Sequence, residues 1–549
     1  MIGIVNENQI NRSGQGQLKV LLIIVAFAAI HHGLTLWAYA DVALWWDEAH
    51  TYWMVKDGFK TVAAKCASEV YPPLYFWILS GWTSQFGYEE WALRSPSVIF
   101  ATLTIFPIYF AAKTAAGFRA AVIAALVAAC VPLLNFYAVE ARAYGLLIFL
   151  ISTAMCFYIQ YLAGPKRTRA LVGFTISIGA ALYSHHYVVF LLPALVMGAL
   201  VFNSDKRCRL AIAILIAELI AFIPYTPWFL VALGSQSGTE WIALYWTGWT
   251  PVLAIMQSIE VFGFGGVYPR YLWHMGPSNR IPFIGIAITC AVIVNLLIDN
   301  HRNNGRKVLD PTPDFAMVLL SAILIPLFCA WAYSWLRSPI YLVGRYDVIS
   351  LPAFILILSI GVERLIESRP RSCGYWLVGL IIGVGLWTST SMIVHAKKAN
   401  WRNFDRECAM EVNRIAQPND LLVCIAMRRI VTEYYLDRIA PNKVELTSYP
   451  PKMNQHPGIY YDPSYLKSDS PALSDALIIK MEINKKLADG KQVFIAHWQY
   501  PGDAVPQVLY QVLVSSLKAT PVGSAPEIAL FRLTKSGSQE NLSEIPSAP

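Results

Sequence analysis

The chain has 549 residues, of which 56% are hydrophobic and only 14% are Asp, Glu, Lys or Arg. A soluble domain usually carries about 25% charged residues, so this composition excludes an ordinary soluble protein. The net charge of +8 does not indicate a nucleic-acid-binding surface, because Lys and Arg gather in short loops between long apolar runs. The 18 Trp and 28 Tyr suit the aromatic belts of a membrane protein. A polytopic α-helical membrane protein is therefore predicted.

Apolar runs long enough to cross about 30 Å of hydrocarbon follow one another along most of the chain and predict about 11–13 transmembrane helices. No small-residue cleavage site follows the first run, so we expect it to be retained as a helix. The predicted spans are 18–40, 73–88, 95–113, 120–138, 144–163, 170–184, 187–203, 210–232, 281–298, 315–336, 347–362 and 374–394.

The basic loops between these runs predict the orientation of the chain. Loops rich in Lys and Arg stay on the inner side of a membrane. These loops are 166–169, 206–209, 301–307 and 363–371. The loops that then lie outside are 41–72, 138–143, 184–187, 233–280 and 337–346, together with everything after 394.

The stretch 73–112 does not fit this alternation. It has to cross the membrane an odd number of times, but it is long for one crossing and short for three. One solution is that the run beginning at Pro72-Pro73-Leu74 is short, tilted or re-entrant. The other is that the turn at 114–119 lies outside.

After about Lys397 charged residues, Pro and Asn become frequent, and the apolar runs shrink to strand length. The runs 421–426, 492–496 and 528–531 read as buried strands, and 402–415 reads as a helix. We therefore predict a transmembrane domain at 1–395, a soluble external α/β domain at 396–535 and a disordered tail at 536–549. The α/β domain has no glycine-rich nucleotide motif.

Two adjacent carboxylates, Asp47 and Glu48, follow the first predicted span directly. Ionisable groups at a membrane surface are functional hypotheses, because they are costly to place there. The alternative is that Asp47 caps a short surface helix, which is a common role for Asp. Spacing alone leaves both interpretations open. The neighbouring Trp45 and Trp46 are expected to be interfacial anchors.

Further polar residues stand at the outer ends of the apolar runs. They are Glu69, Glu140, Arg142, Tyr144, His185, His186, Arg270, His274, Arg337, Arg345 and Tyr346. Each has a plainer interpretation, such as a local ion pair, interfacial packing or a lipid-headgroup anchor. Together they suit a lipid phosphate, because Arg binds phosphate oxygens bidentately and a metal held by Glu and His neutralises the same group.

Several short motifs follow one another in a fixed order. They are Asp47-Glu48-Ala49, Tyr71-Pro72-Pro73-Leu74, Ala92-Leu93-Arg94-Ser95-Pro96-Ser97, Glu140-Ala141-Arg142-Ala143-Tyr144, Ser184-His185-His186-Tyr187, and Arg345-Tyr346 with Leu351-Pro352. This series resembles the dolichyl-phosphate-mannose-protein mannosyltransferase type. Its bacterial relatives include the aminoarabinose transferase of lipid A and the rhizobial galacturonosyltransferase-like proteins. The resemblance runs through residues 40–440.

The resemblance implies the GT-C fold, a polyprenyl- or dolichyl-phosphate-linked sugar donor, and a catalytic Asp in the first external loop, here Asp47. It gives Glu48 a supporting role and implies amphipathic helices within 52–67. In the aminoarabinose relatives a Glu before the Pro-Pro-Leu motif and a later His hold a metal. The nearest matches are Glu69 and His274, so a divalent metal ion is the one cofactor expected.

The expected activity is an inverting transfer of a single sugar from a polyprenyl-phosphate donor to an acceptor hydroxyl, with Asp47 as general base. The residues expected to bind the donor phosphate are Arg142, Arg270, Arg345 and Tyr346, and those expected to line the substrate pocket are Glu140, Tyr144, His185 and His186. The expected location is a cell membrane, the bacterial inner membrane, with the active site and the α/β domain on the external side.

Two other functions compete with this one. A transporter or flippase for lipid-linked saccharides explains the spans, but transporters often contain internal repeats, and this sequence shows none. A polysaccharide ligase or polymerase would move a whole glycan instead of one sugar. The sequence leaves the transferred sugar open, and the acceptor, whether glycan, lipid or protein, is open too.

Overall fold

The structure is a computed structural model. It describes residues 7–164, 167–202, 204–234, 242, 250–263, 312–368, 371–398, 403–455, 471–496, 505–522 and 530–535. The chain forms two compact units, one made of Met1–Asp41 and Val70–Lys398, the other of Val42–Glu69 and Ala399–Pro549. The prediction assigned the external loop 41–72 to the transmembrane domain. In the structure its residues 42–69 belong to the second unit, together with the C-terminal part of the chain.

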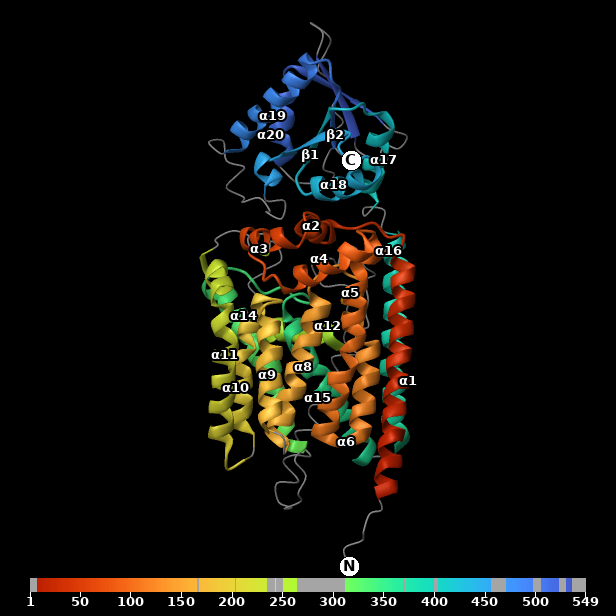
Figure 1. The fold of residues 1–549 in the computed structure, drawn as a ribbon, viewed down its shortest axis with the longest axis vertical. Coiled ribbons are helices and arrows are strands. Elements are labelled where there is room, and N and C mark those ends of the chain that lie inside the picture. The colour runs from red at the N-terminus through yellow and green to blue at the C-terminus, as the bar shows by residue number, and fades with distance from the viewer. Residues whose placement is uncertain are drawn as a thin grey trace, which may run out of the picture. The chain divides into compact units, whose positions relative to one another are not determined.

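The first unit is a bundle of helices (Figure 1). Its elements are α1 (Glu7–Tyr39), α4 (Leu74–Phe86), α5 (Glu90–Leu103), α6 (Ile105–Cys130), α7 (Pro132–Ala138), α8 (Tyr144–Ala163), α9 (Arg167–Leu182), η1 (His186–Phe190), α10 (Leu192–Val201), α11 (Arg207–Gly234), α12 (Pro251–Gly263), α14 (Thr312–Leu336), η4 (Asp347–Ser350), α15 (Leu351–Ser368) and α16 (Arg371–Lys398).

Within the described ranges, 6 stretches are long and apolar enough to cross a membrane. They are Gln15–Tyr39, Glu90–Cys130, Tyr144–Ala163, Arg207–Gly234, Phe315–Leu336 and Asp347–Glu367. The chain is thus a multi-pass membrane protein. The predicted span 281–298 lies outside the described residues, and the predicted total of crossings stays a prediction.

The bundle buries small and branched side chains inside and exposes apolar ones outside. In α1 and α11, Ile23 is 68% exposed and Ile223 is 69% exposed, as expected for side chains that face lipid. Helix α6 contains many buried alanines, including Ala121 and Ala125, and packs against α15. Small side chains allow two membrane helices to approach closely.

Two features of the structure bear on the predicted crossings of residues 73–112, namely the length of α4 and the position of Gly117 in α6. Helix α4 has 13 residues, which span about 20 Å, less than the hydrocarbon core. It starts where the Leu74 amide donates to the carbonyl of Tyr183, 3.0 Å away at the end of α9. Gly117, at φ 87°, interrupts α6. The predicted span 73–88 thus contains a helix that is shorter than a span needs. The predicted span 95–113 falls within Glu90–Cys130, which is long and apolar enough to cross a membrane.

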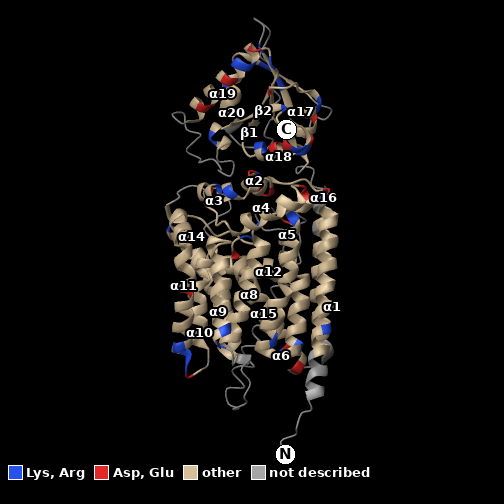
Figure 2. Ribbon diagram, in the orientation of Figure 1, with Lys and Arg blue, Asp and Glu red and all other residues tan. Residues whose placement is uncertain are grey.

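Figure 2 shows Lys and Arg gathered at the end of the bundle where α9 begins and α10 ends, with few in its middle. This end carries the basic loops 166–169 and 206–209. The distribution is that of a membrane protein that obeys the positive-inside rule.

The second unit contains α2 (Trp46–Val55) and α3 (Phe59–Ser68) and a five-stranded α/β fold. The remaining elements are α17 (Phe404–Ile415), β1 (Asp420–Ile425), α18 (Arg428–Ile439), β2 (Val444–Tyr449), η6 (Pro451–Asn454), α19 (Pro471–Ala488), β3 (Val493–Ala496), α20 (Val505–Val514), β4 (Leu517–Pro521) and β5 (Leu530–Lys535).

The sheet has the order β2-β1-β3-β5-β4, and the predicted strands correspond to β1, β3 and β5. Strand β1 runs parallel to β2 and β3, with Leu421 opposite Glu445 on one side and Val493 on the other. Strand β5 is antiparallel to both β3 and β4. The continuous apolar run of β1 reflects burial of both faces of the sheet. The predicted α/β domain is confirmed.

Candidate functional site

Polar residues from separate loops of the first unit meet at one end of the bundle. Arg142 lies in the loop before α8, Tyr144 begins α8, His185 precedes η1, and Arg345 and Tyr346 precede η4. We call these residues the arginine–tyrosine cluster. Arg142 is 5% exposed and Arg345 is 4% exposed. Buried guanidinium groups are costly unless their surroundings stabilise them, so the contacts of each arginine matter.

Arg345 is held by tyrosines. Its Nε donates a hydrogen bond of 2.7 Å to the hydroxyl of Tyr144. Its guanidinium carbon lies 5.9 Å from the ring centroid of Tyr144 and 5.4 Å from that of Tyr346. Both distances are within the range of cation–π attraction. Phenol groups fix the guanidinium in place without adding a negative charge to it.

The turn that carries Arg345 is held in turn by a carboxylate. Oδ2 of Asp347 accepts hydrogen bonds from the Gly344 amide at 3.0 Å and from Ser258 Oγ at 2.6 Å. The hydroxyl of Tyr137 donates to the Gly344 carbonyl. Gly344 has φ 75°, a backbone conformation that residues with a Cβ rarely adopt. The backbone before Arg345 is therefore fixed from both sides.

Arg142 is held by a different tyrosine. Its Nη2 donates to the hydroxyl of Tyr71 at 3.3 Å, and its guanidinium carbon lies 5.4 Å from the centre of that ring. Its own carbonyl accepts from Ser97 Oγ at 3.3 Å, and its amide donates to the Glu140 carbonyl at 2.8 Å. The Glu140 side chain is buried. Both cluster arginines are thus oriented by phenols from neighbouring segments.

His185 is a buried, neutral member of the cluster. Burial lowers the pKa of its imidazole well below the usual value, and the neighbouring His186, Arg345 and Arg142 lower it further, because a second positive charge beside them is unfavourable. Its Nδ1 accepts from the Tyr187 amide at 3.3 Å, which leaves the proton on Nε2. His185 can therefore donate a hydrogen bond without carrying charge.

His186 has a different environment from His185. Its Nε2 lies 3.1 Å from the Val70 carbonyl, which can only accept, so this nitrogen carries the proton. Its Nδ1 accepts from the hydroxyl of Tyr225. Val70 has φ 60°, a strained value for a branched residue. The structure places His186 as a tie for this backbone, outside the arginine–tyrosine cluster.

Asp47 and Glu48 lie in the first turn of α2, in the second unit. The N-cap residue of α2 is Trp45, so the interpretation of Asp47 as the capping residue is wrong. Carboxylates in the first turn are stabilised in their charged form by the helix dipole. Asp47 is half-buried and Glu48 is fully buried. Asp47 is therefore the more accessible of the two carboxylates.

Glu69 lies beside a histidine that the sequence did not single out. Its Oε2 is 3.4 Å from Nε2 of His50, and the two side chains are 3% and 6% exposed. Oxygen and imidazole ligands suit a divalent ion such as zinc, but such a site needs at least three protein ligands. No group of three or more His, Cys, Asp or Glu with that geometry occurs in the described part of the chain. His274 and Arg270 lie outside the described residues.

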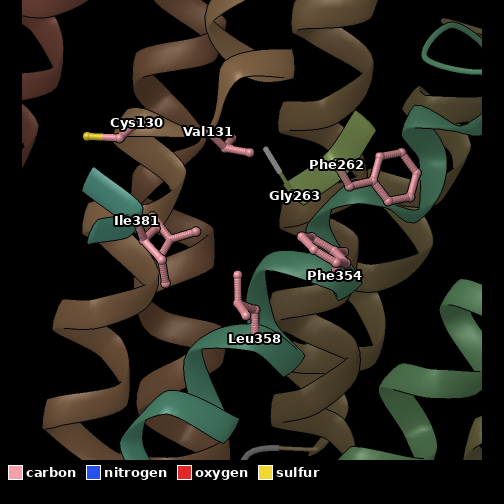
Figure 3. A pocket seen from close by; sticks show the side chains of 8 residues that line it. Cys130, Val131, Phe262, Gly263, Phe354, Leu358 and Ile381 are labelled. Atoms are coloured by element: carbon pink, nitrogen blue, oxygen red, sulfur yellow. The ribbon is translucent and has the colours of Figure 1, made fainter. Parts of the chain in front are cut away.

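An apolar cavity lies inside the bundle (Figure 3). Its lining residues are Val127, Cys130, Val131, Phe262, Gly263, Phe354, Leu358 and Ile381. The Phe262 and Phe354 rings lie 5.7 Å apart. Phe262 belongs to α12, a helix that lies within the predicted external loop 233–280. These residues form an apolar helix packed against α7 and α14.

Several site residues were missed from the sequence although a signal was present. Tyr71 begins the Pro-Pro-Leu motif, and Asp347 follows Arg345-Tyr346 directly. His50 stands one helical turn after Asp47, the spacing that puts two side chains on one helix face. Trp46, expected as a membrane anchor, instead packs against the core of the α/β fold.

Comparison with known proteins gives a family-model match over part of the chain and a fold. Residues 70–230 match the family model described as dolichyl-phosphate-mannose-protein mannosyltransferase. No curated protein sequence matches the chain significantly.

Solved structures match over nearly the whole chain. ArnT from Cupriavidus metallidurans in the apo state is 14% identical, with a TM-score of 0.56 over 95% of this chain and 98% of that one. The same protein bound to undecaprenyl phosphate is also 14% identical, with a TM-score of 0.55 over 94% of this chain and 98% of that one. Archaeal oligosaccharyltransferase AglB from Archaeoglobus fulgidus, in complex with an inhibitory peptide and a dolichol-phosphate, is 12% identical, with a TM-score of 0.52 over 96% of this chain and 75% of that one. At such identities the likeness establishes the fold, and the resemblance indicated by the ordered motifs is confirmed.

Proposed function

We propose that this chain, a multi-pass membrane protein with the fold of the GT-C glycosyltransferases, transfers a single sugar from a polyprenyl-phosphate donor to an acceptor hydroxyl with inversion. The observation that carries the proposal is the arginine–tyrosine cluster, in which Arg142 and Arg345 are buried at one end of an apolar bundle and held by phenols. A lipid-linked phosphate has the apolar tail and the anionic head that such a place would accept. The likeness to a structure bound to undecaprenyl phosphate supports the same donor class.

In this proposal the donor phosphate accepts hydrogen bonds from Arg142 and Arg345. Guanidinium forks match phosphate oxygens bidentately. Arg270 and Tyr346 are proposed as further contacts to the phosphate. Because negative charge grows on the phosphate as it leaves, donors held rigidly in advance stabilise the transition state more than the ground state.

His185 adds a donor of another kind. Its Nε2 proton offers a hydrogen bond to the phosphate or the sugar without adding a third positive charge to the cluster. Glu140 and Tyr144 are proposed to line the sugar pocket with it, and His186 to hold the backbone there.

The chemical step assigns the base to Asp47. The acceptor oxygen attacks the anomeric carbon, and its proton passes to the carboxylate of Asp47. The bond from the anomeric carbon to the phosphate oxygen breaks, and the electron pair leaves with the lipid phosphate. Attack opposite the leaving group inverts the anomeric centre. Glu48, buried next to Asp47 in the chain, is proposed to support it.

For a divalent metal ion, we propose only which residues would bind it. Glu69 and His50 supply two donors of the right chemistry, and the resemblance adds His274. A bound ion would supply positive charge near a phosphate. No step of the transfer is assigned to it, because two ligands do not complete a site.

The location proposed is the bacterial inner membrane, with the reaction on its external face. The acceptor classes are a glycan, a lipid or a protein hydroxyl. Mass analysis of envelope lipids and glycans from cells with and without this protein would identify the sugar and the acceptor together.

The proposal is tested with purified protein and synthetic undecaprenyl-phosphate esters of aminoarabinose, galacturonic acid and mannose, with envelope extract as acceptor. We expect one ester to release undecaprenyl phosphate as its sugar appears on an acceptor. A flippase would move an ester across a liposome without releasing the phosphate. A ligase or polymerase would ignore single-sugar donors and use only a longer glycan. Either result would contradict the proposal.

A further inference from the structure

The second unit brings together segments that are nearly four hundred positions apart in sequence. Helix α2, which carries Asp47 in its first turn, packs against α18 of the C-terminal α/β fold. The function of that fold is not indicated by any motif in it. Its contacts with α2 are therefore the feature that can assign one.

The chain entering α2 is fixed by two contacts. The Leu44 amide donates a hydrogen bond of 3.0 Å to the hydroxyl of Tyr435 in α18. The Trp46 side chain packs against the apolar core of the α/β fold and hydrogen-bonds to Asp405. Asp405 is buried and pairs with Nε of Arg428 at 2.6 Å. The start of α2 is thus anchored in the core of the fold.

The far end of α2 is fixed by charges. Nζ of Lys56, the residue that follows α2, lies 2.6 Å from Oε1 of Glu433 and 3.0 Å from Oδ2 of Asp437. The Tyr52 hydroxyl donates to the same Asp437 oxygen at 3.0 Å. The Tyr52 ring meets the Tyr434 ring edge-on at 4.9 Å. We call Tyr52, Lys56, Glu433 and Asp437 the α2–α18 clasp.

The clasp is partly withdrawn from solvent, which distinguishes it from a surface ion pair. The side chains of Lys56 and Glu433 are 19% and 11% exposed. Burial disfavours the charged form of Lys56, but the carboxylates of Glu433 and Asp437 outweigh it and raise the pKa of the ammonium group. Removing one partner of a partly buried pair leaves the other without compensation, so the pair is costly to break.

We propose that the C-terminal α/β fold acts, through the α2–α18 clasp, as the positioning element for the catalytic helix α2. The clasp residues are positioning residues and not catalytic ones, because they act through the helix that carries Asp47. The proposal rests on the proposed function, in which Asp47 is the base. A base has to be held within a fraction of an ångström of its productive place, and a displacement of about 1 Å costs on the order of 100-fold in rate.

The test compares Lys56→Met with Lys56→Arg and with a matched control, Lys60→Met. Lys60 is an exposed lysine of α3 that lies in the same unit and outside the clasp. Two readouts are taken from full-length protein: hydrogen exchange of the α2 amides, and turnover of the undecaprenyl-phosphate ester that supports transfer.

Lys56→Met is expected to speed exchange in α2 and to lower kcat by roughly 10- to 100-fold, with KM for the donor changed by less than about 3-fold. Lys56→Arg is expected to restore most of both, and Lys60→Met to leave both near wild type. The double variant Glu433→Gln with Asp437→Asn breaks the clasp from the other side and should repeat the Lys56→Met result, which covers the case of a poorly folded single variant.

Faster α2 exchange in Lys56→Met with a wild-type kcat would overturn the positioning role. Unchanged α2 exchange would show that the clasp does not hold the helix, and would overturn it as well. Failure of the proposed function has a different signature. In that case Asp47→Asn keeps wild-type turnover, while the exchange measurements on the clasp variants are unaffected.

Discussion

The arginine–tyrosine cluster and the α2–α18 clasp are both buried polar assemblies, but their cations are oriented by different kinds of side chain. In the cluster, Arg345 is oriented by a phenol that adds no charge to it. In the clasp, Lys56 is matched by carboxylates. A matched charge fixes a structure and has little attraction left for a ligand. Tyrosine hydroxyls and rings orient the buried guanidinium groups of the cluster, and we therefore propose that the cluster binds a phosphate whereas the clasp holds a helix.

The largest expected effect is from removing a cluster cation. Arg345→Met should weaken binding of undecaprenyl phosphate on the order of 100-fold, because it deletes a preorganised donor to the phosphate. Titration of detergent-solubilised protein with undecaprenyl phosphate measures this. Lys56→Met is the matched comparison and should leave this affinity within about 3-fold of wild type. Equal losses in the two variants would erase the distinction between the regions.

The next effect concerns the carboxylate that holds the Arg345 turn. Asp347→Asn should keep the volume but weaken the hydrogen bonds from Ser258 and the Gly344 amide. We expect roughly 10-fold weaker binding of undecaprenyl phosphate, a typical cost for hydrogen bonds to a charged group. Ser258→Ala should show a smaller loss of the same kind. Wild-type affinity in Asp347→Asn would mean that the turn is held without this carboxylate.

A smaller effect is expected from the phenol that orients Arg142. Tyr71→Phe keeps the ring under the guanidinium and removes the hydroxyl at 3.3 Å. We predict about 3- to 10-fold weaker phosphate binding, the usual range for one hydrogen bond. Tyr71→Ala, which also removes the ring, should lose more. If the Phe and Ala variants were equally impaired, the hydroxyl would carry the whole interaction.

The smallest expected effect concerns how the thermal stability of the protein depends on pH. The pKa of His185 is lowered in the folded protein, so the folded state binds this proton less readily than the unfolded state. The stability that depends on neutral His185 is complete above the unfolded pKa of about 6.5 and is lost as pH falls below it. Thermal unfolding in detergent should show a smaller drop in Tm from pH 7.5 to pH 5 for His185→Gln than for wild type. An identical drop would mean that His185 does not contribute.

The sequence predicted features that are encoded locally. The apolar run of β1 was identified as a strand, and the residues at the outer ends of α8 and before η4 were singled out. Most of the arginine–tyrosine cluster follows from one rule: a helix that spans the membrane brings its two ends to opposite surfaces. Residues at the ends of successive spans therefore come together without any knowledge of side-chain packing.

The features that the sequence did not predict depend on contacts between distant segments or on short elements. The pairing of Lys56 with Glu433 and Asp437 joins positions about 380 residues apart, and no local pattern marks it. Helix α12 has 13 residues, fewer than a span needs, so its apolar run was assigned to a loop. The opposite occurs at residues 73–88, which are predicted as a span because the apolar run is longer than the 13-residue helix α4 that it forms.

The measurement that tests the account most directly is turnover by Asp47→Asn in folded, purified protein. Asn keeps the size of the side chain and cannot accept the acceptor's proton as a carboxylate does. We predict that kcat falls by about 100- to 10,000-fold, the contribution of a general base. The affinity for undecaprenyl phosphate should stay at the wild-type value, because the phosphate is assigned to Arg142 and Arg345. Wild-type turnover in Asp47→Asn would contradict the assignment of Asp47 as the base.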